Sequence, residues 1–125
     1  IVSLHVPPCD ETRYLMNKES LAKMKKGAYL INTARGPVVR EDDLAEDLRS
    51  GHLGGAALDV FENEPNINPE LIGMENVILT PHIASATKEA RYKMAELAVE
   101  GILSTLKGNM PTNIVNEEVW NNRRK

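Results

Sequence analysis

The sequence is poor in cysteine and has no excess of positive charge. Cys9 is the only cysteine among 125 residues, so neither an internal disulfide nor a cysteine-based zinc site can form. This usage suits a reducing compartment, and we expect a cytoplasmic protein without a bound metal. The formal net charge is −3, so there is no basic field to attract nucleic acid or an anionic membrane.

Long apolar runs are also missing. No run approaches the length of a transmembrane helix, and no charged and apolar pattern typical of a signal peptide opens the chain. The chain begins at Ile1, inside an apparent strand and without a methionine. Either a segment precedes it or the start has been trimmed. Hydrophobic residues make up 42%, enough for a packed core, which argues against wholesale disorder.

A glycine-rich phosphate-binding turn, G-x-G-x-x-G, is the third absence. Gly51, Gly54 and Gly55 do not supply it, because they precede a predicted strand and not a helix. Either the chain is not a dinucleotide-binding fold, or the first half of such a fold lies upstream of Ile1.

What is present is an alternation of strand and helix patterns. Four short apolar runs predict strands, at residues 1–6, 28–31, 54–59 and 77–80. Amphipathic segments predict helices at 17–26, 41–50 and 88–107. Such alternation is typical of a parallel α/β sheet, in which right-handed crossovers bring all strand ends to one edge. We therefore expect an α/β fold, with half of a doubly wound sheet.

The residues that start and end these helices are recognisable. Asn17 is a candidate N-cap for the first helix, Lys25 and Lys26 are expected near its end, and Gly27 is expected to stop it. In the second helix, Leu44 and Leu48 are expected to face the core. The longest helix carries two adjacent apolar stripes, 94/97/98/101 and 95/99/102/106.

Charged and titratable residues follow three of the predicted strands. Arg35 lies just beyond the second strand, Asp59 ends the third and His82 follows the fourth. Parallel strands would bring them to one edge, where open α/β sheets place their ligands. The planar fork of Arg35 matches a carboxylate, and the small residues around it, Thr33, Ala34 and Gly36, are expected to leave room for a ligand. A surface arginine paired with a nearby acid is the alternative.

Histidine supplies the second part of the hypothesis. His82 can exchange a proton near neutral pH, although a histidine after a strand can equally be structural. Glu62 and Glu64 follow the third strand, and a carboxylate bonded to an imidazole favours its protonated form. Together, a cation for the carboxylate, a proton donor for the carbonyl and a carboxylate that favours the protonated donor suit the reduction of a 2-oxo acid. The hydride must then come from a cofactor.

The motifs resemble the C-terminal part of the D-isomer-specific 2-hydroxyacid dehydrogenases. Four segments carry the resemblance: Met-Lys-Lys-Gly-Ala-Tyr-Leu-Ile-Asn-Thr-Ala-Arg-Gly-Pro at 24–37, Ile-Val-Ser-Leu-His-Val-Pro at 1–7 and on to residue 12, Asp-Val-Phe-Glu-Asn-Glu-Pro at 59–65, and Pro-His-Ile-Ala-Ser at 81–85. The spacing of Arg35, Asp59 and Glu64 agrees as well. The resemblance covers essentially the whole chain.

The resemblance implies a role for each matching residue. Arg35 would hold the substrate carboxylate, His82 would be the acid/base, and Glu64, not Glu62, would be its partner. It implies NAD or NADP as cofactor, with Asp59 on the nicotinamide side. The remaining implied cofactor-binding residues are Thr33, Ala34, Ala84 and Ser85 around the nicotinamide, with Arg35 and His82, and Val6, Pro7 and Thr12 toward the adenosine and phosphate end.

The resemblance also implies an organisation. Residues 1–108 would form the C-terminal part of the NAD(P)-binding domain, and 109–125 a tail returning to a substrate domain that lies mostly upstream. The complete protein would be a homodimer acting on a small 2-oxo or 2-hydroxy acid, and the chain alone would be inactive. Formate dehydrogenases of this family carry Gln at the Glu64 position, so Glu64 argues for a 2-hydroxyacid enzyme.

Residues 109–116 look most like those of glyoxylate and hydroxypyruvate reductases. Two alternatives remain open. The first is a phosphoglycerate dehydrogenase-type enzyme, and the second is a non-catalytic, NAD-sensing protein that resembles the corepressors related to these enzymes.

Overall fold

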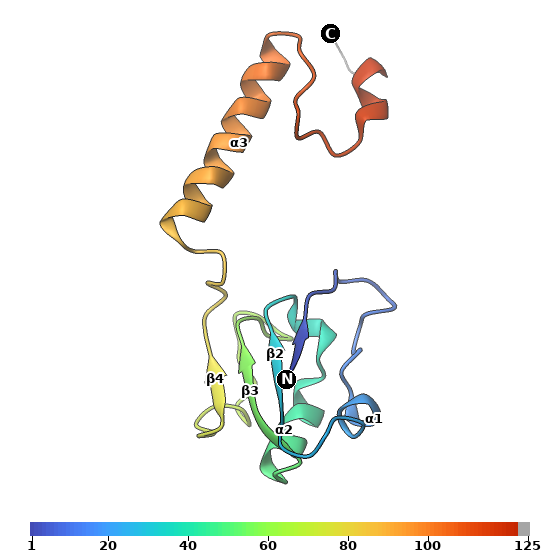
Figure 1. Cartoon of the computed structure of the whole chain (residues 1–125), viewed down its shortest axis with the longest axis vertical. Helices are drawn as coiled ribbons and strands as arrows, with labels where there is room; N and C mark the ends of the chain where they lie inside the picture. Colours follow the sequence, from blue (N-terminus) through green and yellow to red (C-terminus); the bar gives the residue numbers. More distant parts are fainter. Residues whose placement is uncertain (123–125) are drawn as a thin grey trace. The chain divides into compact units, whose positions relative to one another are not determined.

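Four short strands lie side by side in one parallel sheet. They are β1 (Val2–Leu4), β2 (Ala28–Asn32), β3 (Leu53–Leu58) and β4 (Val77–Leu79), and they occur in the sheet in that order. This computed structural model describes residues 1–122 and divides into two units, Ile1–Ala84 and Ser85–Lys125. The sheet belongs to the first unit (Figure 1). The predicted parallel α/β fold is confirmed.

Helices connect the first three strands. α1 (Lys18–Leu21) joins β1 to β2, and the 3₁₀ turn η1 (Gly36–Val38) and α2 (Glu41–Arg49) join β2 to β3. The Asn17 side chain caps α1 as predicted. The helix is shorter than predicted, however, and Lys25 and Lys26 lie beyond its end. After Ala22 the chain continues in separate turns, because the amides of Lys23 and Met24 bond carbonyls three residues back and no longer four.

The register of the sheet decides which side chains enter the core. One row across the four strands is Val2, Leu30, Ala56 and Val77, and it faces α1 and α2. Leu21 from α1 and the predicted inward residues of α2, Leu44 and Leu48, are buried against this face. Because side chains alternate along a strand, the next row points to the opposite face.

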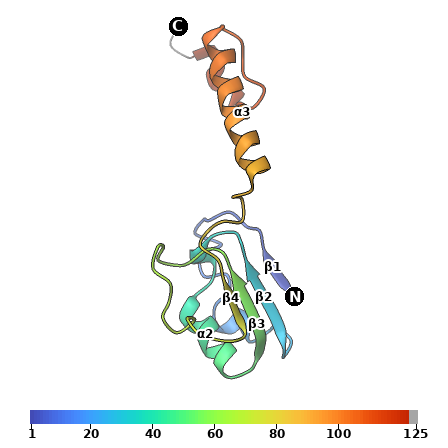
Figure 2. The same cartoon turned by 90° about the vertical axis from the view of Figure 1, so that its left-hand side faces the viewer.

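The opposite face of the sheet carries apolar side chains that remain exposed. Tyr29 is 52% exposed and Ile78 is 66% exposed. Both helices between the strands lie on the other side of the sheet within this unit (Figure 2). Within the first unit, helices therefore cover only one face of the sheet.

The second unit is built on α3 (Lys88–Leu106), whose N-cap Thr87 accepts a hydrogen bond from the Ala90 amide. Neither predicted apolar stripe is buried in the described residues. Gly101 faces Asn113, whose amide donates to the Leu97 carbonyl at 3.3 Å. The last described element is a 3₁₀ helix, η2 (Glu117–Asn122). Among the described residues, no helix is long and apolar enough to cross a bilayer.

Candidate functional site

Asp59 lies at the carboxyl end of β3, where it joins two neighbouring segments. Its Oδ1 accepts from the Thr80 hydroxyl at 2.6 Å and from the Ile83 amide at 2.8 Å, and its Oδ2 accepts from the Ala84 amide at 2.8 Å. Burial alone would raise the pKa of Asp59, but these hydrogen bonds, assisted by His82, lower it below its ordinary value. The buried carboxylate therefore stays charged and holds the backbone after β4 in place.

The turn that carries Arg35 is organised by a residue that the sequence did not single out. Asn32 is 1% exposed, and its side chain accepts from the Ala34 amide and donates to the Arg35 carbonyl, both at 3.0 Å. The Arg35 guanidinium donates to the Ala34 carbonyl at 2.7 Å and is exposed. An asparagine that bridges its own turn is recognisable from sequence only as a residue type that favours turns.

Gly36 has a different role from the one expected. A Cβ at this position would lie 1.8 Å from the Phe61 carbonyl oxygen, so the small size of Gly36 admits the backbone of the loop after β3. The expectation that Gly36 leaves room for a ligand is therefore wrong. This close approach brings the Arg35 turn next to the loop that carries Glu64.

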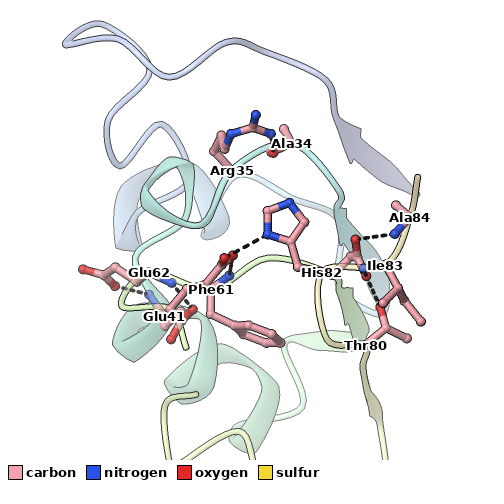
Figure 3. Close-up of polar contacts among 11 residues, drawn as sticks. Ala34, Arg35, Glu41, Phe61, Glu62, Thr80, His82, Ile83 and Ala84 are labelled. Atoms are coloured by element: carbon pink, nitrogen blue, oxygen red, sulfur yellow. Dashed lines mark hydrogen bonds and ion pairs between the residues drawn. The ribbon is translucent and has the colours of Figure 1, made fainter. Parts of the chain in front are cut away.

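His82 and Glu64 are hydrogen-bonded to each other at this edge of the sheet. The distance from His82 Nδ1 to Glu64 Oε2 is 2.8 Å, and the two side chains are 49% and 36% exposed. The other carboxylate oxygen, Oε1, accepts from the Phe61 amide at 3.0 Å. The second nitrogen of the His82 ring points toward the turn of Ala34 and Arg35 in Figure 3. His82 also has a φ of +53°, a backbone conformation that is uncommon outside glycine.

Electrostatics link Arg35 to this pair. The hydrogen bond from His82 lowers the pKa of Glu64 most, followed by the bond from the Phe61 amide, and the positive charge of Arg35 lowers it further. Parallel strands thus bring Arg35, Asp59, Glu64 and His82 to one edge. Glu62 lies elsewhere and does not contact His82: its carboxylate accepts from Tyr14 and from the Glu41 amide.

The expected adenosine and phosphate end lies beyond β1. Val6 and Pro7 follow this strand, and the Thr12 hydroxyl donates to the Pro7 carbonyl at 2.6 Å and accepts from the Cys9 amide at 2.9 Å. Thr12 therefore folds the loop back on itself. A cavity of about 220 Å³ is lined by the neighbouring residues Pro8, Cys9, Asp10, Thr12, Arg13, Pro37 and Val38.

The residues present fit one half of a dinucleotide. Asp59 Oδ2 accepts one hydrogen bond from the described protein and has acceptor capacity for another donor, such as a carboxamide. Ala34 and Ala84 have small side chains, and Thr33 is exposed just beyond the end of β2. Ser85 begins the second unit. The chain lacks the glycine-rich turn that would hold a pyrophosphate.

Residues 1–84 match the family model described as "D-isomer specific 2-hydroxyacid dehydrogenase, NAD binding domain". The chain is 58% identical over 120 residues to a glyoxylate reductase from Thermofilum pendens, an alignment that covers 95% of this chain and 35% of that protein. The chain thus spans about a third of the length of the curated relatives it matches.

Solved structures of other proteins are similar to this chain in both fold and sequence. One is a D-lactate dehydrogenase with NAD⁺ from Lactobacillus jensenii, with a TM-score of 0.84, 30% identity, and coverage of 92% of this chain and 39% of that one. Another is an NADPH-dependent glyoxylate/hydroxypyruvate reductase from Sinorhizobium meliloti in complex with NADP and malonate. Its TM-score is 0.77 at 38% identity, and the match covers 82% of this chain and 32% of that one.

Proposed function

This chain belongs to the D-isomer specific 2-hydroxyacid dehydrogenases, and on that premise we propose that the whole protein transfers a hydride between NAD(P)H and a small 2-oxo acid. The observation that carries the proposal is the His82–Glu64 pair, 2.8 Å apart, within the electrostatic reach of Arg35. The relatives named as glyoxylate reductases and glyoxylate/hydroxypyruvate reductases support glyoxylate or hydroxypyruvate as the substrate.

Arg35 binds the carboxylate of the substrate in the proposed reaction. Its guanidinium is planar, permanently charged and exposed, and two parallel N–H groups match two carboxylate oxygens. Asn32 holds the backbone on both sides of this residue, so the turn is set before substrate arrives. Binding the carboxylate orients the neighbouring carbonyl and supplies positive charge beside its oxygen.

His82 supplies the proton. Because Nδ1 is held by Glu64, the opposite nitrogen, Nε2, is the ring atom that gives a proton to the carbonyl oxygen during reduction and takes one from the hydroxyl during oxidation. The Glu64 carboxylate fixes the ring orientation and favours the protonated ring. NAD(P)H, when bound, supplies the hydride. Asp59 would accept a hydrogen bond from its carboxamide.

Steady-state assays of the whole protein test this function. NADH and NADPH oxidation would be followed with glyoxylate, hydroxypyruvate and 3-phosphohydroxypyruvate as substrates. We expect turnover with the first two and little with the phosphorylated acid. Preference for the phosphorylated acid would favour the phosphoglycerate dehydrogenase-type alternative, and cofactor binding with negligible turnover of any acid would favour the NAD-sensing alternative.

Three further properties remain predictions. We propose that the whole protein is a homodimer, which size-exclusion chromatography with light scattering tests. We propose a cytoplasmic location, which fractionation of the source cells tests.

We also propose that residues 109–125 belong to the substrate domain and residues 1–108 to the NAD(P)-binding domain. Limited proteolysis tests that division, because cleavage near Gly108 would mark the boundary.

A further inference from the structure

Glu62 lies two residues before Glu64 and contacts a different set of residues. Its Oε1 accepts from the Tyr14 hydroxyl at 2.5 Å, and its Oε2 accepts from the Glu41 amide at 3.3 Å. In return, Glu41 Oε1 accepts from the Glu62 amide at 2.7 Å, as Figure 3 shows. One side chain therefore joins three segments: the loop before α1, the start of α2 and the loop after β3.

This arrangement brings two carboxylates close together at a site with little solvent. Glu41 is 4% exposed. Burial raises the pKa of Glu41, and the charges of Glu62 and Asp42 raise it further. Arg13 and Arg40 lie over the Tyr14 ring, at 4.6 and 5.4 Å from its centre. The two carboxylates repel each other, but each satisfies the backbone amide of the other residue, which would otherwise be poorly paired.

The contacts lead from Glu62 to the proposed acid/base pair. The Glu62 amide is held by Glu41, and the preceding amide, that of Phe61, donates to Glu64 Oε1. The other oxygen of Glu64 bonds the His82 ring. The conformation of residues 61 and 62 therefore determines where the Glu64 carboxylate lies. Among the residues that the structure describes, Arg35 and Asp59 are the other charged groups that interact with the Glu64–His82 pair.

We propose that Glu62 is a positioning residue, which holds the loop after β3 so that Glu64 stays bonded to His82. The inference rests on the proposed function, because it assigns to Glu62 a support role for the same proton transfer. Groups that transfer protons need supports that fix their geometry, and a displacement of about 1 Å can reduce a rate by about a hundredfold.

Two substitutions of Glu62 in the whole protein test this role. Glu62→Ala removes both acceptors, whereas Glu62→Gln keeps an oxygen for the Glu41 amide and an amino group that can donate to the Tyr14 oxygen. We expect Glu62→Ala to lower kcat/KM for glyoxylate reduction about tenfold. We also expect the pH profile of kcat/KM to change in this variant. Its decline at high pH should begin at a lower pH, because the Glu64 carboxylate is no longer held in place beside the His82 ring. Glu62→Gln should restore most of both properties.

Glu70→Ala is the matched control. Glu70 lies further along the same loop, and its exposed carboxylate pairs with Arg49. We expect its pH profile to equal that of the unmodified protein. A Glu62→Ala enzyme whose decline stays at the original pH would overturn the proposal and leave Glu62 with a purely structural role. If Glu62→Ala does not fold, Tyr14→Phe replaces it, since this variant removes only the hydroxyl that bonds Glu62. A smaller shift of the pH profile in the same direction supports the proposal, and an unshifted profile overturns it.

A second readout separates this inference from the proposed function. The ring of His82 can be titrated by NMR in the whole protein without any turnover. If the unmodified protein reduces no 2-oxo acid, the proposed function fails. If the midpoint of the His82 titration is nevertheless lower in Glu62→Ala than in the unmodified protein, the positioning role is supported. An unchanged midpoint would overturn it.

Discussion

At the scale of single residues, the edge of the sheet places Arg35 and His82 near two carboxylates, Glu64 and Asp59. Arg35 lowers the pKa of Glu64, Glu64 accepts a hydrogen bond from His82, and His82 helps to lower the pKa of the buried Asp59. The pKa values of both carboxyl groups lie below their ordinary values, so both remain charged near neutral pH. Arg35 therefore has a negative neighbour in Glu64, and His82 interacts with two carboxylates, those of Glu64 and Asp59.

Substitution of Arg35 should separate the substrate from the cofactor. We expect Arg35→Ala in the whole protein to raise the KM for glyoxylate about tenfold to a hundredfold, the range for loss of a charged hydrogen bond. The Kd for NADH should change little. Arg35→Lys should fall between, because it keeps the charge without the planar fork. Steady-state kinetics and cofactor fluorescence give the two values, and an equal loss of both affinities would contradict the role of Arg35.

Removing the charge of Glu64 should change the pH dependence of the reaction. Reduction requires the protonated His82 ring, and the Glu64 carboxylate favours that form. In Glu64→Gln we therefore expect the rate of reduction to decline at a lower pH than in the unmodified protein. Full pH profiles of kcat/KM provide the measurement. Glu75→Gln, at the opposite end of β4, controls for the loss of a charge, and identical profiles for both variants would remove Glu64 from the mechanism.

At the scale of elements, the site depends on a close approach between the turn before η1 and the loop after β3. Gly36 is buried, and the Phe61 carbonyl occupies the space that a side chain would need. The same loop is also held by Glu41, at the start of α2. The position of Glu64 is thus decided by packing between connecting segments rather than by a single strand.

Gly36→Ala tests this packing. The added methyl group would overlap the Phe61 carbonyl, and overpacking of this kind lowers the free energy of unfolding by about 1–3 kcal/mol. Activity of the whole protein should fall as well, because the loop that carries Glu64 must move. Gly51→Ala is the control: its Cβ would meet nothing within 4 Å, although its φ of +71° is unfavourable for alanine. Urea unfolding compares the two, and equal behaviour with full activity would argue against the close approach.

At the scale of the whole molecule, the first unit is covered on one face only. The helices of this unit lie against one side of the sheet, and Tyr29 and Ile78 remain exposed on the other. The apolar stripes of α3 are exposed too. An isolated chain with exposed apolar faces associates more readily, because the hydrophobic effect favours burial of such surface.

Ile78→Thr should improve the behaviour of the isolated chain. Threonine keeps the preference for a strand and replaces an exposed apolar side chain by a polar one. We expect less light scattering at a given concentration and little change in unfolding. Leu79→Thr, the next residue, is the control: it packs against the core from the covered face, so its substitution should lower stability. Equal scattering of Ile78→Thr and the unmodified chain would contradict the prediction.

The amino-acid sequence by itself determined the local structure and the residue types of the site. Strand and helix patterns predicted the parallel sheet, and Asn17 and Leu44 predicted a cap and an inward face that the structure confirms. These features depend on neighbours a few residues apart, so their periodicity is visible in the chain. The order of Arg35, Asp59 and His82 after successive strands likewise predicted a common edge.

The tertiary structure alone decided which side chains meet. The spacing of Glu62 and Glu64 did not show that one contacts Tyr14 and the other His82, and the sequence marked Asn32 only as a residue type that favours turns. Gly36 was misinterpreted for the same reason, since its neighbour Phe61 is distant in sequence. Such pairings depend on the register of the strands and on packing between distant segments, and no local pattern in the chain records either.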